Sequence, residues 1–304
     1  MYTFPRFSAC CLALSLLLLL PVSLGHAAES KAPEAIATPQ VITPEQFLAT
    51  MLGNAEQGDA RAMLVVAGIY QQGLGVPPNY SKVLEWSEKA AFAGEAEGYL
   101  RLGQCYETGM GTPVNMEKAV KAYEQAISMN HPVAQHKLAT LLLAGRGLPK
   151  NIEMGLALLQ KSADNGFSIA ANELGFIHYQ GLFGQKADLA KAKSLFLKGA
   201  EAGNLEAIKN YAVMLKDGLG QKADPQGALR WFLIGHKGGL DGGDLQAIVD
   251  GLKKQLKPAE IEQAEKDAEA FVTAFAEKQG QVAPPQTGQT GRAGQNVIRQ
   301  KVNK

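Results

Sequence analysis

Small and apolar residues recur along this chain at helical spacing, in blocks that glycines interrupt at regular intervals. In the first block, Ala62, Val66 and Tyr70 follow one another every four residues, which is the spacing of one face of an α-helix. A Gly-x-Gly turn with a proline follows at 73–77, and Asn79 is a suitable cap for a second amphipathic helix. The block therefore predicts a helix, a glycine-rich turn and a second helix.

The glycine-rich turn returns at an almost constant interval. Turns begin at Gly73, Gly109, Gly145, Gly181 and Gly218, so that the successive differences are 36, 36, 36 and 37 residues. The turn at 181–184 keeps this period with one extra residue. A period of this length indicates a solenoid, in which each helical pair buries its apolar face against the next pair.

The repeated unit resembles the Sel1-like repeat family, which is related to the tetratricopeptide repeats. The family pattern is A-x-x-x-L-G-x-x-Y-x-x-G-x-G-V followed by D-Y-x-x-A-x-x-W-x-x-x-A-A-x-x-G. The first unit supplies Ala62, Tyr70 and Trp86, and the second supplies Leu102 and Gly103. The resemblance implies an all-α fold, a right-handed α-solenoid of helix-turn-helix repeats with about five Sel1-like repeats and helical caps. A tetratricopeptide array, with a period of about 34 residues, is the alternative.

The resemblance and the polarity of the flanking segments predict the organisation of the whole chain. The predicted parts are a signal peptide (1–28), a flexible spacer (29–42), an N-terminal capping helix (43–57), five repeats (58–93, 94–129, 130–165, 166–202, 203–239), a C-terminal helical cap (240–279) and a disordered tail (280–304).

The first residues have the pattern of an export signal. Arg6 precedes an apolar run from Cys10 to Leu24, and small residues at Ala27 and Ala28 are suitable for cleavage. A retained membrane anchor is the alternative, but about 15 apolar residues are fewer than the roughly 20 that span a bilayer. We therefore expect a protein secreted across the inner membrane and located in the periplasm, with an extracellular location also open.

The charge balance restricts the kinds of partner that the sequence predicts, and the cysteine content restricts the disulfides that the chain can form. The chain has 30 basic and 29 acidic residues, a balance that predicts neither a nucleic-acid surface nor a polybasic membrane surface. We expect membrane contact only through a partner. Removal of the signal leaves Cys105 as the single cysteine, so the mature chain cannot form an internal disulfide.

The sequence offers no recognisable catalytic, cofactor-binding or metal-binding motif. It has no HExxH, no cysteine pair and no G-x-S-x-G elbow, so we expect no enzyme activity, no cofactor and no metal. His178 stands where the family has tyrosine and is expected in the core. Cys105 is expected to be buried and inert, and His131, at a helix start, to face solvent.

The resemblance also indicates where a partner would bind. In the related tetratricopeptide superhelix, the first helix of each repeat lines the concave side. The corresponding positions here are Arg61, Leu64, Gln71, Glu97, Leu100, Gln104, Glu107, His136, Thr140, Leu143, Asn172, Phe176, Tyr179, Lys209, Val213 and Lys216. Apolar residues in line across five repeats favour a groove of exposed apolar anchors with a polar rim, and packing between helices is the alternative.

These features together predict an exported, non-enzymatic adaptor or scaffold. It would bind a peptide or protein partner in the concave groove, in envelope assembly, signalling or cell contact. Two alternatives stay open at this point: a periplasmic hydrolase, related to the β-lactamase-like members of the family, and a polysaccharide-assembly scaffold.

Overall fold

A computed structural model of the 304-residue chain describes residues 43–242 and 244–281. The predicted signal peptide, spacer and tail lie outside these residues, apart from the first two residues of the tail. Within them every regular element is an α-helix. The helices are α1 (Pro44–Glu56), α2 (Ala60–Gln72), α3 (Tyr80–Phe92), α4 (Ala96–Thr108), α5 (Met116–Ser128), α6 (Pro132–Ala144), α7 (Ile152–Asp164), α8 (Ser168–Gln180), α9 (Leu189–Glu201), α10 (Leu205–Asp217), α11 (Pro225–Lys237), α12 (Leu245–Lys253) and α13 (Pro258–Gln281).

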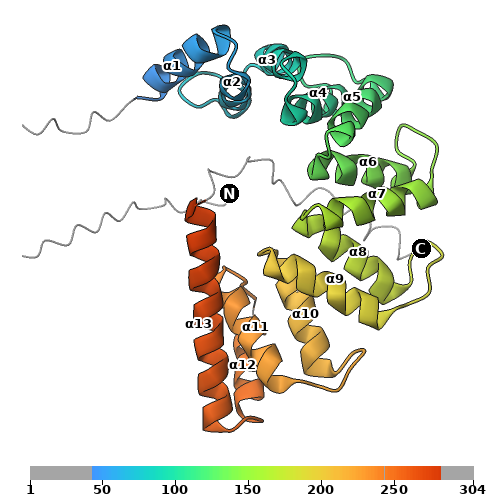
Figure 1. Cartoon of the computed structure of the whole chain (residues 1–304), viewed down its shortest axis with the longest axis vertical. Helices are drawn as coiled ribbons and strands as arrows, with labels where there is room; N and C mark the ends of the chain where they lie inside the picture. Colours follow the sequence, from blue (N-terminus) through green and yellow to red (C-terminus); the bar gives the residue numbers. More distant parts are fainter. Residues whose placement is uncertain (1–42, 243, 282–304) are drawn as a thin grey trace, which may run out of the picture. The chain divides into compact units, whose positions relative to one another are not determined.

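Ten of these helices, each 13 residues long, form five consecutive helix pairs. We call α2, α4, α6, α8 and α10 the first helices and α3, α5, α7, α9 and α11 the second helices of repeats 1 to 5. From α1 to α11 each helix packs against the helix before it and the helix after it, as Figure 1 shows. The predicted all-α solenoid is confirmed.

Each turn between the two helices of a repeat is held at both ends. Every first helix ends at a glycine with a left-handed backbone, which a residue without a Cβ adopts at no steric cost. Every second helix begins after an asparagine or aspartate whose side chain accepts a hydrogen bond from the backbone of the helix. The amide of that capping residue donates to a carbonyl of the first helix, as in Asn79 N to Tyr70 O at 2.9 Å. The chain therefore reverses direction in the same way in each repeat.

Small residues let the helices approach closely enough for large side chains to fill the space between them. The Tyr123 ring lies where a Cβ on Gly103 would be, and the Phe196 ring occupies the same place beside Gly175. The two tryptophans, Trp86 and Trp231, are buried in the first and last repeats. The core is therefore a continuous series of apolar contacts between successive repeats rather than one central cluster.

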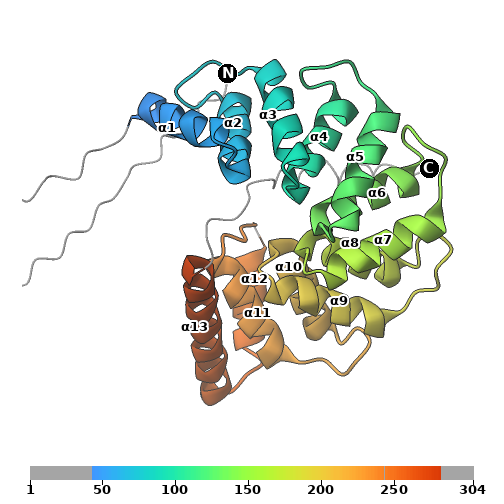
Figure 2. The ribbon, with the colours of Figure 1, turned by 45° about the horizontal axis from the view of Figure 1, so that its top comes forward.

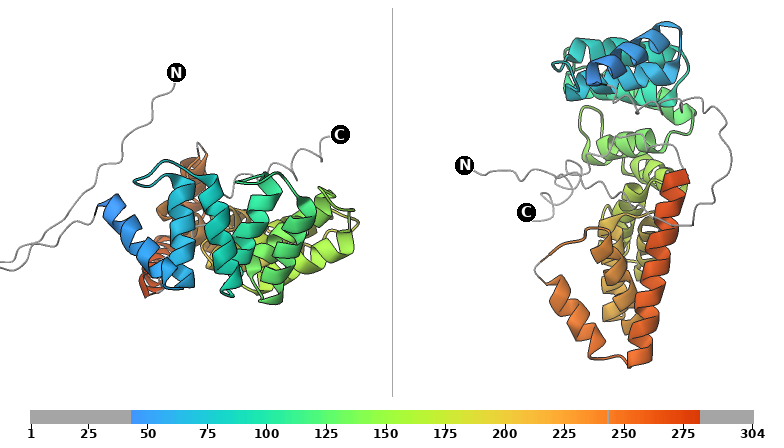
Figure 3. Two further views of the ribbon diagram at one scale, coloured as in Figure 1. Left: turned by 90° about the horizontal axis from the view of Figure 1, so that it is seen from above. Right: turned by 90° about the vertical axis from the view of Figure 1, so that its left-hand side faces the viewer.

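Helices outside the repeats cover both ends of the series. At the N-terminal end Thr43 and Gln46 form a capping box, and Pro44 packs against Gly75 of the first turn. At the other end α13 packs against α11, and Figure 3 shows the two helices side by side. The rings of Trp231 and Phe271 meet edge to face at 5.3 Å. None of the helices in the described part of the chain is long and apolar enough to cross a membrane.

Candidate functional site

The sixteen residues predicted to contact a partner all lie on the first helices, and we call the surface of these helices the first-helix surface. Figure 2 shows α2, α4, α6, α8 and α10 in succession along the solenoid. Their side chains differ widely in exposure: two of the sixteen are exposed, nine are half-buried and five are buried. The two exposed residues are Arg61 and Lys209. The sixteen residues therefore do not form one uniform groove.

Two predicted apolar anchors, Leu100 and Leu143, belong to the core. Leu100 is 2% exposed and lies in a cluster with Tyr123 and Leu138, and Leu143 is 6% exposed and packs near Leu159. The prediction that these two leucines are exposed on the first helices is wrong. The neighbouring helices cover both side chains, which leaves no apolar surface there for a partner.

Three buried polar residues of the set, Glu97, His136 and Asn172, bind to neighbouring repeats. His136 Nε2 lies 2.9 Å from Glu173 Oε2, and Asn210 Nδ2 donates to Asn172 Oδ1 at 2.9 Å. These bonds link α6 to α8 and α8 to α10. They satisfy polar groups that would otherwise be costly to bury, so they stabilise the stacking of the repeats. The expectation that these side chains are exposed is wrong for the same reason as for the two leucines.

Glu97 lies at the centre of a polar network on this surface. Its carboxylate accepts from Arg101 Nε at 3.0 Å and lies 3.3 Å from His131 Nε2. Arg101 also donates to Gln71 at 3.4 Å, so the network joins repeats 1, 2 and 3. The expectation that His131 faces solvent is wrong, because its ring packs between repeats to reach Glu97.

Glu107 also has partners within the chain. Its carboxylate accepts a hydrogen bond of 2.6 Å from the Tyr123 hydroxyl and pairs with Arg146 of the next turn. Thr140 donates to the backbone of its own helix, to His136 O at 2.9 Å. Most polar groups of the first-helix surface in repeats 2 and 3 are therefore bonded inside the protein.

The first-helix surface has a different character over repeats 4 and 5. Phe176 and Tyr179 are half-buried and pack against the cluster that includes Phe196 and Met214. Val213 is half-buried on the next first helix, at the position that corresponds to Phe176. Lys209 makes no ion pair among the described residues, and Lys216 pairs only with its neighbour Asp217. Partly exposed apolar side chains on α8 and α10, and two lysines on α10, remain here for a partner.

Sequence reasoning missed the residues that complete the bonds between repeats. Arg101, Glu173 and Asn210 each directly precede the leucine or tyrosine that marks the middle of a first helix. They lie 30, 37 and 38 residues after their partners Gln71, His136 and Asn172. Complementary polar residues about one period apart, here 30 to 38 residues, are therefore the signal that could have identified them.

The remaining candidate chemistry is structural. Cys105 is 1% exposed, and burial raises the pKa of its thiol to about 11, so the thiol is protonated and inert at neutral pH. No group of three or more His, Cys, Asp or Glu side chains that could hold a metal ion occurs in the part of the chain that the structure describes.

Comparison with known families gives five matches to one model. The Sel1 repeat model matches residues 60–94, 96–131, 132–167, 168–204 and 205–235, which together cover more than half of the chain. Each match contains one first helix and all or most of one second helix. No curated protein is similar enough to this chain to count as a relative.

Several solved structures are similar in fold. A Sel1 repeat protein from Oxalobacter formigenes is 22% identical, with 77% of this chain and 94% of that chain covered and a TM-score of 0.59. The protective antigen c5321 of uropathogenic Escherichia coli, which has an SLR fold, is 20% identical, with 79% and 68% covered and a TM-score of 0.47. The immunity protein Pa5087 of Pseudomonas aeruginosa is 21% identical, with 79% and 78% covered and a TM-score of 0.45.

Proposed function

The chain belongs to the Sel1 repeat family, and from this premise we propose that it is an exported, non-enzymatic scaffold that binds a protein or peptide partner on its first-helix surface. Sel1 repeat proteins commonly mediate interactions between proteins, and their scaffold is generally non-enzymatic. The contact would lie over repeats 4 and 5, at Phe176, Tyr179, Val213, Lys209 and Lys216.

The difference between the two parts of the first-helix surface carries this proposal. In repeats 2 and 3 the acidic groups Glu97 and Glu107 already have cationic partners inside the chain. In repeats 4 and 5 the aromatic rings are partly open, and Lys209 has no ionic partner among the described residues. Aromatic side chains are enriched at the core of protein interfaces, whereas charged groups such as lysines lie at the polar rim. A partner with apolar and acidic side chains would complement the aromatic rings and the lysines of repeats 4 and 5.

The cellular role follows from the export signal expected at residues 1–28. An exported scaffold would act in the periplasm, in envelope assembly, signalling or contact between cells. The comparisons give no support to the hydrolase alternative or to the polysaccharide-assembly alternative.

The proposal is tested by capture from the periplasmic fraction of cells that produce the full-length precursor. Lys209→Glu reverses an exposed charge without removing core contacts, so we expect the variant to fold and to lose the captured partner at least about tenfold. N-terminal sequencing of the same sample should find a mature protein that begins near Ala28 or Glu29.

The matched control is Lys161→Glu, which reverses an exposed lysine on the second helix α7. Quantitative mass spectrometry should find the same captured proteins with this control as with the unmodified chain. Equal losses with both variants, or none with Lys209→Glu, would contradict the proposed surface. Recovery of the uncleaved precursor in the membrane fraction would contradict export.

A further inference from the structure

The turns of repeats 4 and 5 are identical in sequence except for one inserted residue. Repeat 4 has Gly-Leu-Phe-Gly-Gln-Lys-Ala-Asp at 181–188, and repeat 5 has Gly-Leu-Gly-Gln-Lys-Ala-Asp at 218–224. The inserted residue is Phe183. Repeat 5 is therefore an internal reference for the effect of this residue.

Both ends of the two turns are held by equivalent hydrogen bonds. Leu182 N donates to Ile177 O at 3.0 Å, as Leu219 N does to Met214 O at 3.0 Å. At the far end Asp188 N donates to a carbonyl of α8 at 2.8 Å, and the matching bond in repeat 5 is also 2.8 Å. Because both ends are fixed, the turn of repeat 4 must accommodate the extra residue between them.

With the extra residue, the second glycine of the repeat 4 turn does not reach the preceding second helix. In repeat 5 a Cβ on Gly220 would lie 3.0 Å from Leu189 Cβ, at the start of α9. In repeat 4 a Cβ on Gly184 would meet no atom within 4 Å. Phe183 has a left-handed φ of 57°, which is unfavourable for a bulky residue. Its half-buried ring packs against the apolar cluster that includes Leu159 and Leu174, as Ile152 does.

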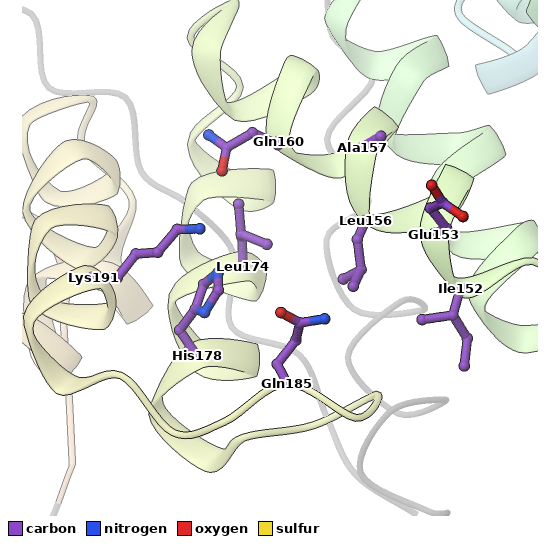
Figure 4. A pocket seen from close by; sticks show the side chains of 9 residues that line it. All are labelled: Ile152, Glu153, Leu156, Ala157, Gln160, Leu174, His178, Gln185 and Lys191. Carbon is purple, nitrogen blue, oxygen red and sulfur yellow. The ribbon is translucent and has the colours of Figure 1, made fainter.

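A groove lies beside this turn, between α7, α8 and the start of α9. Its volume is about 510 Å³, within the range of ligand-binding pockets. Figure 4 shows Lys191 and His178 at one end and Ile152 and Glu153 at the other, with Leu156 and Gln185 between them. Leu174 of α8 contributes to its apolar lining.

Gln185 in the groove lacks the partner that its counterpart Gln221 has in repeat 5. Gln221 accepts a hydrogen bond from Lys193 on the preceding second helix. Its counterpart Gln185 instead faces Leu156, which occupies the position of Lys193 on α7 and cannot donate. The Gln185 amide and the Lys191 ammonium make no side-chain hydrogen bond or ion pair among the described residues. The groove therefore combines an apolar lining with an unpaired cation and an unpaired amide.

We propose that this groove binds the carboxyl-terminal end of a polypeptide whose last residue is apolar. The α-carboxylate would lie at Lys191, and the apolar side chain would pack between Leu156 and Leu174. A carboxyl-terminal residue carries its charge and its side chain on one Cα, which suits a cation directly beside an apolar lining. The Gln185 amide would pair with the last peptide group.

The charges at the two ends of the groove fix the direction of the bound peptide. Glu153 would repel a carboxylate, so the chain would run from the Glu153 end towards Lys191. Burial, and then the positive charge of Lys191, lower the pKa of His178, so its ring is neutral at neutral pH and offers a hydrogen bond rather than a second positive charge.

This site does not depend on the partner surface proposed above. Leu174 and His178, four residues apart, lie on one face of α8. At about 100° per residue, Phe176 is offset from that face by about half a turn and Tyr179 by about a third of a turn, so both lie on other faces of the same helix. Binding in the groove and binding on the first-helix surface can therefore succeed or fail separately.

The test is a fluorescence-polarisation titration of the full chain with a labelled hexapeptide that ends in two leucines and a free carboxylate. The same peptide with a carboxyl-terminal amide serves as the second probe. We expect the free acid to bind at least about tenfold more tightly than the amide, because only the acid can pair with Lys191. Lys191→Gln should remove this preference and leave the melting temperature unchanged, since Lys191 is exposed.

The matched control is Lys118→Gln, which changes the lysine at the same position of repeat 2. Lys118 already lies over the Tyr106 ring, with its ammonium 5.2 Å from the ring centre, so we expect the peptide affinity to stay unchanged. Three results would each overturn the proposal: equal affinity for acid and amide, equal weakening by the two lysine variants, or no binding of the acid below about 1 mM.

Discussion

The turns of repeats 4 and 5 differ by one inserted residue, Phe183, yet only in repeat 5 does the second glycine of the turn lie against the preceding second helix. In repeat 5 the second glycine reaches Leu189, and Gln221 bonds to Lys193. In repeat 4 a Cβ on the matching glycine would meet no atom within 4 Å, and the matching glutamine lines an open groove. In this comparison a single insertion in a turn accompanies an open groove, with the first helices unchanged at 13 residues.

The largest expected effect on stability separates the two turn glycines. Gly184 and Gly220 have almost the same φ, 76° and 75°, so alanine at either position carries the same left-handed backbone cost of about 1–2 kcal/mol. Alanine at Gly220 also presses on Leu189, which should lower the free energy of unfolding by about a further 1 kcal/mol.

Urea unfolding of Gly184→Ala and Gly220→Ala measures this difference directly, because the backbone cost cancels between the two variants. Equal destabilisation by both alanines would mean that the turn of repeat 5 does not close on α9 as described.

A smaller effect concerns the pH dependence of stability. His178 in repeat 4 corresponds to Leu215 in repeat 5. Burial, followed by the charge of Lys191, lowers the pKa of His178 below the 6.5 of an unperturbed histidine. Between the lower pKa of the folded chain and the pKa of about 6.5 in the unfolded chain, the unfolded chain binds more protons than the folded chain. The free energy of unfolding therefore has its full value above about pH 6.5 and decreases as the pH falls through the pKa of the folded chain.

His178→Leu copies repeat 5 and should remove this loss. Denaturant unfolding at about pH 7.5 and about pH 5 should find a smaller decrease in stability for the variant than for the unmodified chain. The same decrease in both proteins would show that His178 does not bind a proton differently on unfolding.

The fold could be predicted from the sequence because its determinants are local and repeated. Glycine ends each first helix, asparagine or aspartate caps each second helix, and small residues recur at the helix contacts. Each of these signals acts within about 36 residues. Because the same signals recur in five copies, each copy supports the prediction made from the others.

The partner surface was predicted less well because exposure depends on the packing between repeats. Leu100 and Leu143 occupy positions that a helix-by-helix comparison leaves open, but the adjoining helices cover them. Glu97 and His136 are likewise buried because they contact His131 and Glu173 of neighbouring repeats. Periodicity identifies the face of a helix, whereas the tilt between successive repeats decides how much of that face stays accessible.

The groove in repeat 4 could not be predicted from the sequence either, because it also depends on packing between repeats. The extra residue in the turn is visible in the sequence, as an insertion into an otherwise regular period. Its consequence is not visible there, because it depends on the bonds that hold both ends of the turn and on Leu156 of the preceding repeat. The functional meaning of an insertion in a repeat therefore has to be derived from the contacts that it removes.

Deletion of Phe183 tests most directly whether this one residue creates the groove, because it converts the turn of repeat 4 into that of repeat 5. The hexapeptide with a free carboxylate is titrated into the unmodified chain and into the deletion variant at the same salt and pH. We predict a folded variant whose Gly184 packs against the start of α7 and whose affinity for the peptide is at least about tenfold weaker. Unchanged affinity in a folded deletion variant would contradict the account.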